Sequence, residues 1–121
     1  MDKNYKSIQE ASIDSFCITD IFGRLLSVNK AFLIMSGYTK TELLTKTLQD
    51  LESKKDSGVT NQIIERVLQT GIEIGEIEQQ NKKGEVIEVQ ISITYNSNHN
   101  DRLYAFFRDN THKNNRDKAL I

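Results

Sequence analysis

The sequence predicts a single α+β domain, an antiparallel sheet with helices mainly on one of its faces. Three observations lead to this fold class. Two short apolar runs joined by a turn come first, several capped helical segments follow, and three segments of strand character come last. A chain of 121 residues is long enough for one hydrophobic core and too short for two, so we expect one domain.

The first elements are an amphipathic helix and a β-hairpin. Residues 1–12 are polar, with apolar residues at helical spacing, and predict a weakly amphipathic helix ahead of the first strand. Asp20 and Gly23 have the D-x-x-G spacing of a turn, because an aspartate accepts hydrogen bonds at the start of a turn and glycine tolerates positive φ at its end. The apolar residues on either side, at 16–18 and 25–28, predict the paired strands.

Two short helices are predicted next. Asn29 is placed to accept a hydrogen bond at the N-terminus of a helix over residues 30–36, and Gly37 is placed to close that helix in the left-handed conformation. Thr39 and Glu42 have the spacing of a capping box. A second helix is therefore expected to begin at once.

A longer helix is predicted before the last strands. Residues 46–55 are charged and ambiguous, and we expect at most a short helix around Leu48 and Leu51, followed by a loop. The longer helix runs from residue 56 or 57, where Asp and Ser offer the cap, to residue 70, and Gly71 provides its stop. Its apolar face consists of Val59, Ile63, Val67 and Leu68.

Three strands complete the predicted fold. Residues 72–80 alternate in polarity, with an interruption at Gly75 that predicts a β-bulge. A turn leads to residues 86–95, the most regular strand pattern in the chain, with one buried and one wetter face. After a loop, residues 103–108 form a strand that is apolar on both faces.

This last strand predicts association. Its inner face can meet the helices, so its outer face, with Tyr104 and Phe106 or their alternates, needs cover from the N-terminal helix or from another subunit. We therefore expect a homodimer formed through residues 1–12 and the outer face of the sheet.

The order and spacing of these features resemble the PAS domain. The resemblance is carried by the D-x-x-G turn, N-K-A-F at 29–32, G-Y-T-K-T-E-L-L at 37–44 and G-E-I-E-Q-Q-N-K-K-G-E-V-I-E-V at 75–89. It covers roughly residues 8–112 and implies a five-stranded sheet in the order 2-1-5-4-3. The competing interpretation is an unrelated α+β domain with well-made caps.

The resemblance also implies a division of the chain. Residues 1–12 would be a flanking helix, residues 13–111 the PAS domain, and residues 112–121 the start of an exit helix or linker to an output domain. The ending at 119–121 favours a fragment of a longer protein. Asp109 and Thr111 match the D-[IVL]-T ending of PAS domains and are the expected signal-relay residues. Asn110 departs from the usual apolar residue, and the alternative reading of this ending is simply a helix cap.

A pocket between sheet and helices is the candidate site. In the family this space either holds a small ligand or is filled by side chains, and both alternatives stand here. The expected lining is mostly aliphatic, so any ligand should be largely apolar. The lining residues are Phe32, Met35, Tyr38, Leu43, Ile63, Val67, Ile77, Val89, Ile91 and Phe107.

Composition argues against several classes of function. The 16 basic and 17 acidic residues are interspersed, so neither nucleic acid nor an anionic membrane is an expected partner. The longest apolar runs are far too short to cross a membrane. The sequence has no recognisable catalytic motif, and we expect a module that is not an enzyme.

Metal, haem and flavin are not expected either. His99 and His112 have no metal-ligating partner at the required spacing. Haem-binding PAS relatives take an axial histidine from the long helix, where this chain has none. Light-sensing relatives carry their flavin-reactive cysteine in a G-x-N-C-R-F-L-Q motif, whereas Cys17 lies in the first predicted strand. A single cysteine suits a reducing cytoplasm.

The resulting expectation is a non-catalytic sensory and dimerisation module of a cytoplasmic, bacterial-type signalling protein. It would relay the state of a ligand or partner to the output domain of a two-component histidine kinase or a diguanylate cyclase. The alternative is a flavin- or haem-binding redox or light sensor.

Overall fold

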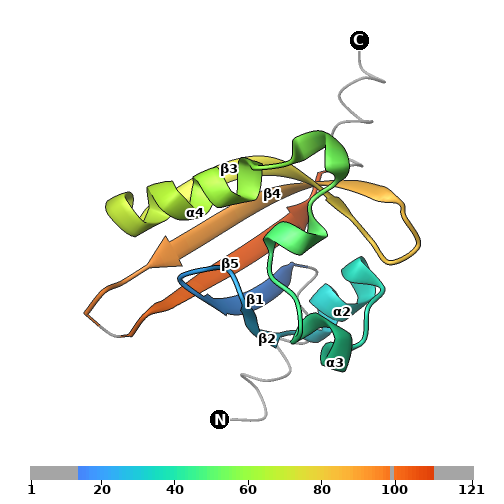
Figure 1. The fold of residues 1–121 in the computed structure, drawn as a ribbon, viewed down its shortest axis with the longest axis horizontal. Helices are drawn as coiled ribbons and strands as arrows, with labels where there is room; N and C mark the ends of the chain where they lie inside the picture. Colours follow the sequence, from blue (N-terminus) through green and yellow to red (C-terminus); the bar gives the residue numbers. More distant parts are fainter. Residues whose placement is uncertain (1–13, 99, 111–121) are drawn as a thin grey trace.

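The computed structural model describes residues 14–98 and 100–110 (Figure 1). Within them, five strands form one antiparallel sheet in the order β2-β1-β5-β4-β3, which confirms the predicted fold class and strand order. The elements are, in chain order, β1 (Ser15–Asp20), β2 (Leu25–Val28), α2 (Lys30–Ser36), α3 (Lys40–Leu43), the 3-10 helices η1 (Gln49–Leu51) and η2 (Lys54–Asp56), α4 (Val59–Thr70), β3 (Ile72–Gln80), β4 (Val86–Tyr95) and β5 (Arg102–Asp109).

Some of the predictions lie outside the described residues. These are the flanking helix at 1–12, the exit segment at 112–121, and the residues His99, Thr111 and His112.

The β1–β2 hairpin forms as predicted because Asp20 organises its turn. One carboxylate oxygen, Oδ1, accepts hydrogen bonds from the backbone N–H groups of Phe22 at 2.9 Å and Arg24 at 3.0 Å. Gly23 adopts a φ of 93°, in the left-handed region that a glycine enters at little cost. The turn chemistry read from the sequence is therefore the chemistry that closes this hairpin.

The predicted caps of α2 and α3 are confirmed. Asn29 Oδ1 accepts from the backbone N–H of Phe32 at 2.9 Å, and Gly37 closes α2 with a φ of 75°. Thr39 and Glu42 form the reciprocal capping box, at 3.2 Å and 2.9 Å. Each cap satisfies backbone groups that a helix end leaves without a partner.

The start of α4 differs from the prediction. Neither position 56 nor 57 caps it; the helix begins at Val59, after Gly58. The side chain of Glu52 lies against this end, where one carboxylate oxygen accepts from Gly58 N at 2.9 Å and the other from Thr60 N at 2.8 Å. A carboxylate from upstream thus supplies the acceptors that a local Asp or Ser was expected to supply. In the ambiguous region before it, the short helix expected near Leu48 and Leu51 is the 3-10 helix η1.

The predicted bulge at Gly75 is wrong. β3 and β4 pair without interruption from Ile72 opposite Thr94 to Gln80 opposite Val86. The apolar pattern changes phase because Ile72 and Ile74, before Gly75, lie on the exposed face of the strand, whereas Ile77 lies on the buried face. A Cβ on Gly75 would lie 3.1 Å from Ile63 Cδ1 of α4, so the glycine allows the helix to pack closely on the sheet. The sheet does carry an irregularity, in the β1–β2 pairing next to Ile18.

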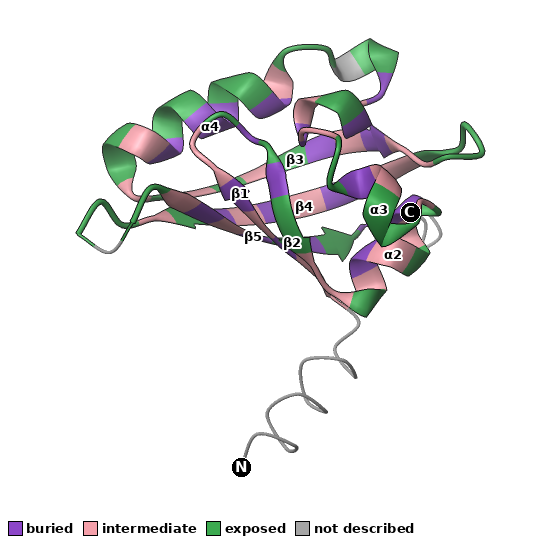
Figure 2. Ribbon diagram, turned by 60° about the horizontal axis from the view of Figure 1, so that its bottom comes forward, coloured by how far each residue is buried: buried purple, intermediate pink, exposed green. Residues whose placement is uncertain are grey.

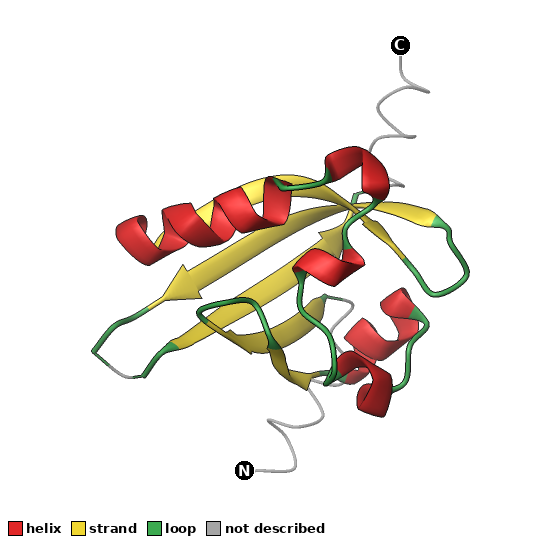
Figure 3. Ribbon diagram, viewed as in Figure 1, coloured by secondary structure: helices red, strands yellow, loops and turns green. Residues whose placement is uncertain are grey.

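The core lies between the helices and one face of the sheet. α4 lies along β3 and β4, while α2 packs beside β1 with α3 next to it (Figures 1 and 3). The sides of the elements that meet in this layer are the buried segments in Figure 2. Phe32 of α2 and Phe107 of β5 meet edge to face there, with ring centroids 5.6 Å apart.

Candidate functional site

The structure brings all ten predicted pocket residues into one apolar cluster. Met35 and Tyr38 are partly buried and pack against it, and the others are fully buried within it. In this arrangement the side chains pack against one another between sheet and helices. That these residues line a ligand site stays a prediction.

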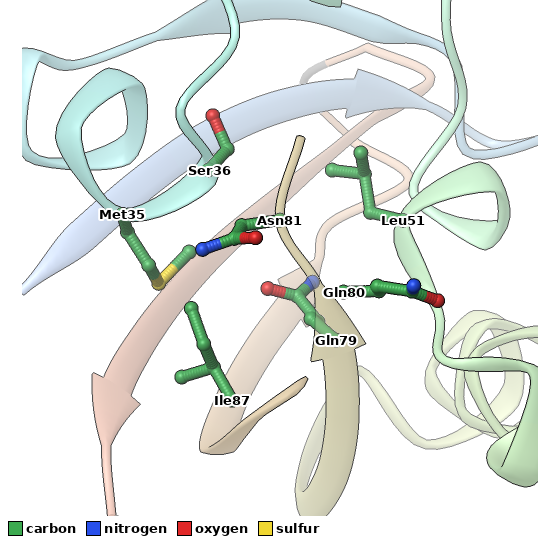
Figure 4. Close-up of a pocket in the computed structure, with 7 residues that line it drawn as sticks. All are labelled: Met35, Ser36, Leu51, Gln79, Gln80, Asn81 and Ile87. Atoms are coloured by element: carbon green, nitrogen blue, oxygen red, sulfur yellow. The ribbon is translucent and has the colours of Figure 1, made fainter. Parts of the chain in front are cut away.

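A small cavity opens at one edge of the cluster, at the base of the β3–β4 hairpin. Its volume is about 10 Å³, the space of about one water molecule. Figure 4 shows the side chains around it, which come from α2, η1 and both strands of the hairpin. They are Met35, Ser36, Leu51, Gln79, Gln80, Asn81 and Ile87.

Of the residues that line this cavity, only Met35 was among the predicted pocket residues, and Gln79 is the most informative of those that sequence reasoning missed. Its side chain is 4% exposed, and its Nε2 is buried without a hydrogen-bond partner. The alternation of β3 could have identified it, because Gln79 follows Ile77 by two residues and two residues along a strand return to the same face.

Lys82 fastens the tip of the hairpin to the helices. Its backbone N–H donates to Ser36 O at 2.9 Å, and its ammonium group lies 2.9 Å and 3.1 Å from the two carboxylate oxygens of Glu42. The ammonium groups of Lys46 and Lys82 lie 5.0 Å and 6.0 Å from the centroid of the Tyr38 ring. We call these Lys82 contacts the hairpin clamp.

The clamp and the capping box share one carboxylate, and this affects its titration. The Thr39 backbone N–H and then the Lys82 ammonium group hydrogen-bond to Glu42 and lower its pKa from 4.5 to about 2. Glu42 is therefore ionised throughout the physiological range.

The outer face of the sheet is a second candidate surface. Phe16 and Phe106 are paired across β1 and β5 with ring centroids 4.7 Å apart, and Phe106 is 49% exposed. On the same face, β3 presents Ile72 and Ile74, which are 59% and 64% exposed. The strand register carries this row of side chains across the sheet, because Phe106 lies opposite Ser92, which lies opposite Ile74. We call Phe16, Phe106, Ile72 and Ile74 together the outer apolar row.

The end of β5 is tied to the sheet by polar contacts. Asp109 is the last residue of β5 and lies opposite Val89. The next residue, Asn110, is buried, its backbone N–H donates to Glu88 O at 2.9 Å, and its Nδ2 lies 3.5 Å from Glu76 Oε1. Hydrogen bonds to β3 and β4 therefore anchor the position where the family has an apolar residue.

Cys17 and the buried face of α4 are the positions that bear on a flavin adduct or a haem ligand. Cys17 is fully buried, and burial raises the pKa of its thiol. The buried face of α4 carries Thr60, Ile63, Ile64 and Val67, without a histidine or cysteine to bind iron. Among the described residues there is also no cluster of three metal-ligating side chains and no helix that could span a membrane.

Comparison with known proteins identifies the family of the chain. A family model described as a PAS domain matches residues 13–112. A search of curated proteins returned no match.

Similar solved structures include a domain of a sensory box sensor histidine kinase/response regulator from Geobacter sulfurreducens. It is 26% identical with a TM-score of 0.75, and the alignment covers 89% of this chain and 93% of that one. The PAS domain of an HTR-like protein from Haloarcula marismortui is 20% identical with a TM-score of 0.76, over 89% and 90% of the chains. A LOV domain from a blue-light activated histidine kinase of Erythrobacter litoralis is 18% identical with a TM-score of 0.67, over 78% and 94%. The last two similarities concern the fold alone.

Proposed function

Because the chain belongs to the PAS domain family, we propose that it is a non-catalytic sensory and dimerisation module, which relays the state of a ligand or partner to an output domain. PAS domains are sensory modules, and this one is related to the sensor domain of a histidine kinase. That relationship supports a two-component histidine kinase of bacterial type as the owner, ahead of a diguanylate cyclase. The buried thiol of Cys17 suits the cytoplasm.

The outer apolar row is the observation that carries this proposal. Large apolar side chains that are about half exposed and gather on one face are typical of an association surface, and here only Ser92 separates Phe106 from Ile74. The residue just before β1, Asp14, lies on this face as well, because its carboxylate is 3.4 Å from the guanidinium group of Arg108, two residues after Phe106 in β5. We infer that a second copy covers the row, with residues 1–12 completing a two-fold interface.

The position of β5 gives such an interface a route to the output domain. β5 lies in the middle of the sheet between β1 and β4, and carries Phe106 in the row as well as Asp109 at its end. A shift of one copy against the other moves β5. Asn110, directly after this strand, transfers the movement to the segment that leads to the output domain. Asp109 and Thr111 are the proposed relay residues, the first at the end of the strand and the second beyond the described residues.

We also propose that the module carries neither haem nor flavin. The cavity at the base of the β3–β4 hairpin, about 10 Å³, is far below the several hundred Å³ of a cofactor site. The buried face of α4 carries no histidine or cysteine, and burial raises the pKa of the Cys17 thiol in β1, which lowers its reactivity. An absorbance spectrum of the purified chain tests this point, because a Soret or flavin band would contradict it.

Light scattering after size exclusion tests the association. We expect the chain to dimerise and Phe106→Glu to weaken the dimer by at least ~10-fold, because a charge in the row cannot be buried without a partner. Ile34→Glu is the matched control: Ile34 is 73% exposed but lies on α2, away from the outer face. A chain that stays monomeric at high concentration, or equal effects of the two variants, would refute the proposal.

A further inference from the structure

The unpartnered amide of Gln79 is the starting point. Native proteins rarely leave a buried donor without an acceptor, and such a donor calls for an explanation. Figure 4 shows the Gln79 carboxamide in the middle of the cavity, with Met35 and Asn81 on one side and Leu51 on the other. The donor is therefore available to an occupant of the cavity.

The neighbouring amides cannot satisfy Gln79, because the hairpin turn already uses them. Asn81 Oδ1 accepts from Glu85 N at 2.8 Å, and Asn81 Nδ2 donates to Glu85 Oε1 at 3.0 Å. Gln80 Nε2 donates to Gly84 O at 3.2 Å. Within the described residues, Gln79 Nε2 is therefore left without an acceptor.

The lining decides which acceptor fits best. A water molecule brings two donors of its own. Met35, Leu51 and Ile87 offer them no acceptor, and the side chains of Ser36, Gln80 and Asn81 already take part in hydrogen bonds within the chain. A carboxylate would lose its hydration for a single neutral donor, which does not compensate the burial of its charge. A carbonyl oxygen only accepts, is neutral, and has the size of the space.

We propose that this crevice receives the carbonyl oxygen of a small, neutral, largely apolar molecule such as a ketone, ester or amide, with Gln79 Nε2 as the donor. This inference rests on the proposed sensory function and specifies the chemistry of its ligand. The apolar body of the ligand lies along Met35 and Ile87. A methionine suits a wall that must adapt, since its unbranched side chain repacks easily, and Ser15 Oγ holds its sulfur only weakly, at 3.4 Å.

The hairpin clamp connects this site with the rest of the fold. Lys82 bonds to Ser36, which lines the crevice, and to Glu42 on α3, so the hairpin and the helices close over the cavity together. A ligand that widens the crevice moves β3 and β4, and the backbone and side chain of Asn110 are bonded to these two strands.

The test is an NMR titration of the 121-residue chain with 2-butanone as the probe. We expect saturable shifts of the Gln79 side-chain amide and of backbone amides 79–81. The matched probe is 2-methyl-1-butene, in which a methylene replaces the carbonyl oxygen, and it should bind at least ~10-fold more weakly. Gln79→Met should weaken butanone binding to a similar extent, whereas Gln62→Met, on the exposed side of α4, should leave it unchanged.

The inference is overturned if no shift saturates, if both probes bind equally, or if Gln79→Met binds butanone as tightly as the wild type. A nuclear Overhauser effect from Gln79 to water that persists at high butanone would assign a structural water only, and would overturn it as well. If Gln79→Met does not fold, the comparison of the two probes on the wild type decides alone. A chain that dimerises without binding butanone refutes this inference and leaves the proposed function standing.

Discussion

Replacing Asn29 with alanine should destabilise the domain more than the loss of an ordinary helix cap. Asn29 Oδ1 accepts from Phe32 N at 2.9 Å, which caps α2, and from Phe16 N at 3.0 Å, which belongs to β1. Loss of an Asn cap costs about 1 kcal/mol, and leaving a second, partly buried N–H without its acceptor costs about 1–2 kcal/mol more. We therefore expect Asn29→Ala to lower the free energy of unfolding by about 2–3 kcal/mol.

Urea and thermal denaturation followed by circular dichroism would measure this loss. For a domain of this size, 2–3 kcal/mol corresponds to a fall in Tm of about 10–20 °C. Asn29→Asp keeps the double acceptor and loses only the bond from Nδ2 to Asp14 O, so it should cost about 1 kcal/mol or less. Asn61→Ala, on the exposed side of α4, should change stability by less than ~0.5 kcal/mol. If Asn29→Ala and Asn61→Ala are equally stable, the dual role of Asn29 is refuted.

Three further predictions follow from individual contacts. Gly75→Val should destabilise the chain by about 1–3 kcal/mol, because the new side chain collides with Ile63. Adding Ile63→Val should recover part of that loss, and additive losses of stability in the double variant would contradict the contact. The pKa of Glu42 is lowered to about 2, so the stability it contributes is present above pH 4.5 and is lost as the pH falls toward 2. The Tm of Glu42→Gln should therefore depend less on pH in that window than the wild-type Tm, and parallel Tm curves would count against the clamp. Cys17 should react with a thiol reagent at least ~100-fold more slowly in the folded chain than in denaturant, and equal rates would show that β1 opens readily.

The parts of the fold that could be predicted from sequence are those with short-range causes. In their role as helix caps, Asn29, Gly37 and the Thr39–Glu42 capping box act within four residues of the groups they satisfy, so their spacing alone was informative. The alternation of β4 was equally direct, because both of its faces keep a constant polarity. The strand order is different: it was implied by the resemblance to a family and not by the pattern of any strand.

The errors concern contacts between distant segments. Glu52 caps α4 from outside the helix, across a loop and η2, and no local spacing announces it. Gly75 looked like a bulge because its role depends on Ile63 of the helix above. Gln79 is buried because the β3–β4 hairpin lies against α2. The polarity of a glutamine gives no indication of such burial. The sequence thus identified residues of the apolar cluster, but it named only Met35 of the side chains that line the cavity.

The pairing of the first and last strands has a further use. Ser15 of β1 lies opposite Phe107 of β5, so the backbone enters and leaves the described fold at neighbouring points, with Cα atoms about 5 Å apart as in any antiparallel pair. A domain whose ends meet in this way can be spliced into a surface loop of a host protein without forcing the two sides of that loop apart. The segment from β1 to β5 is therefore a suitable insert for a fusion in which opening of the sheet is reported by the host.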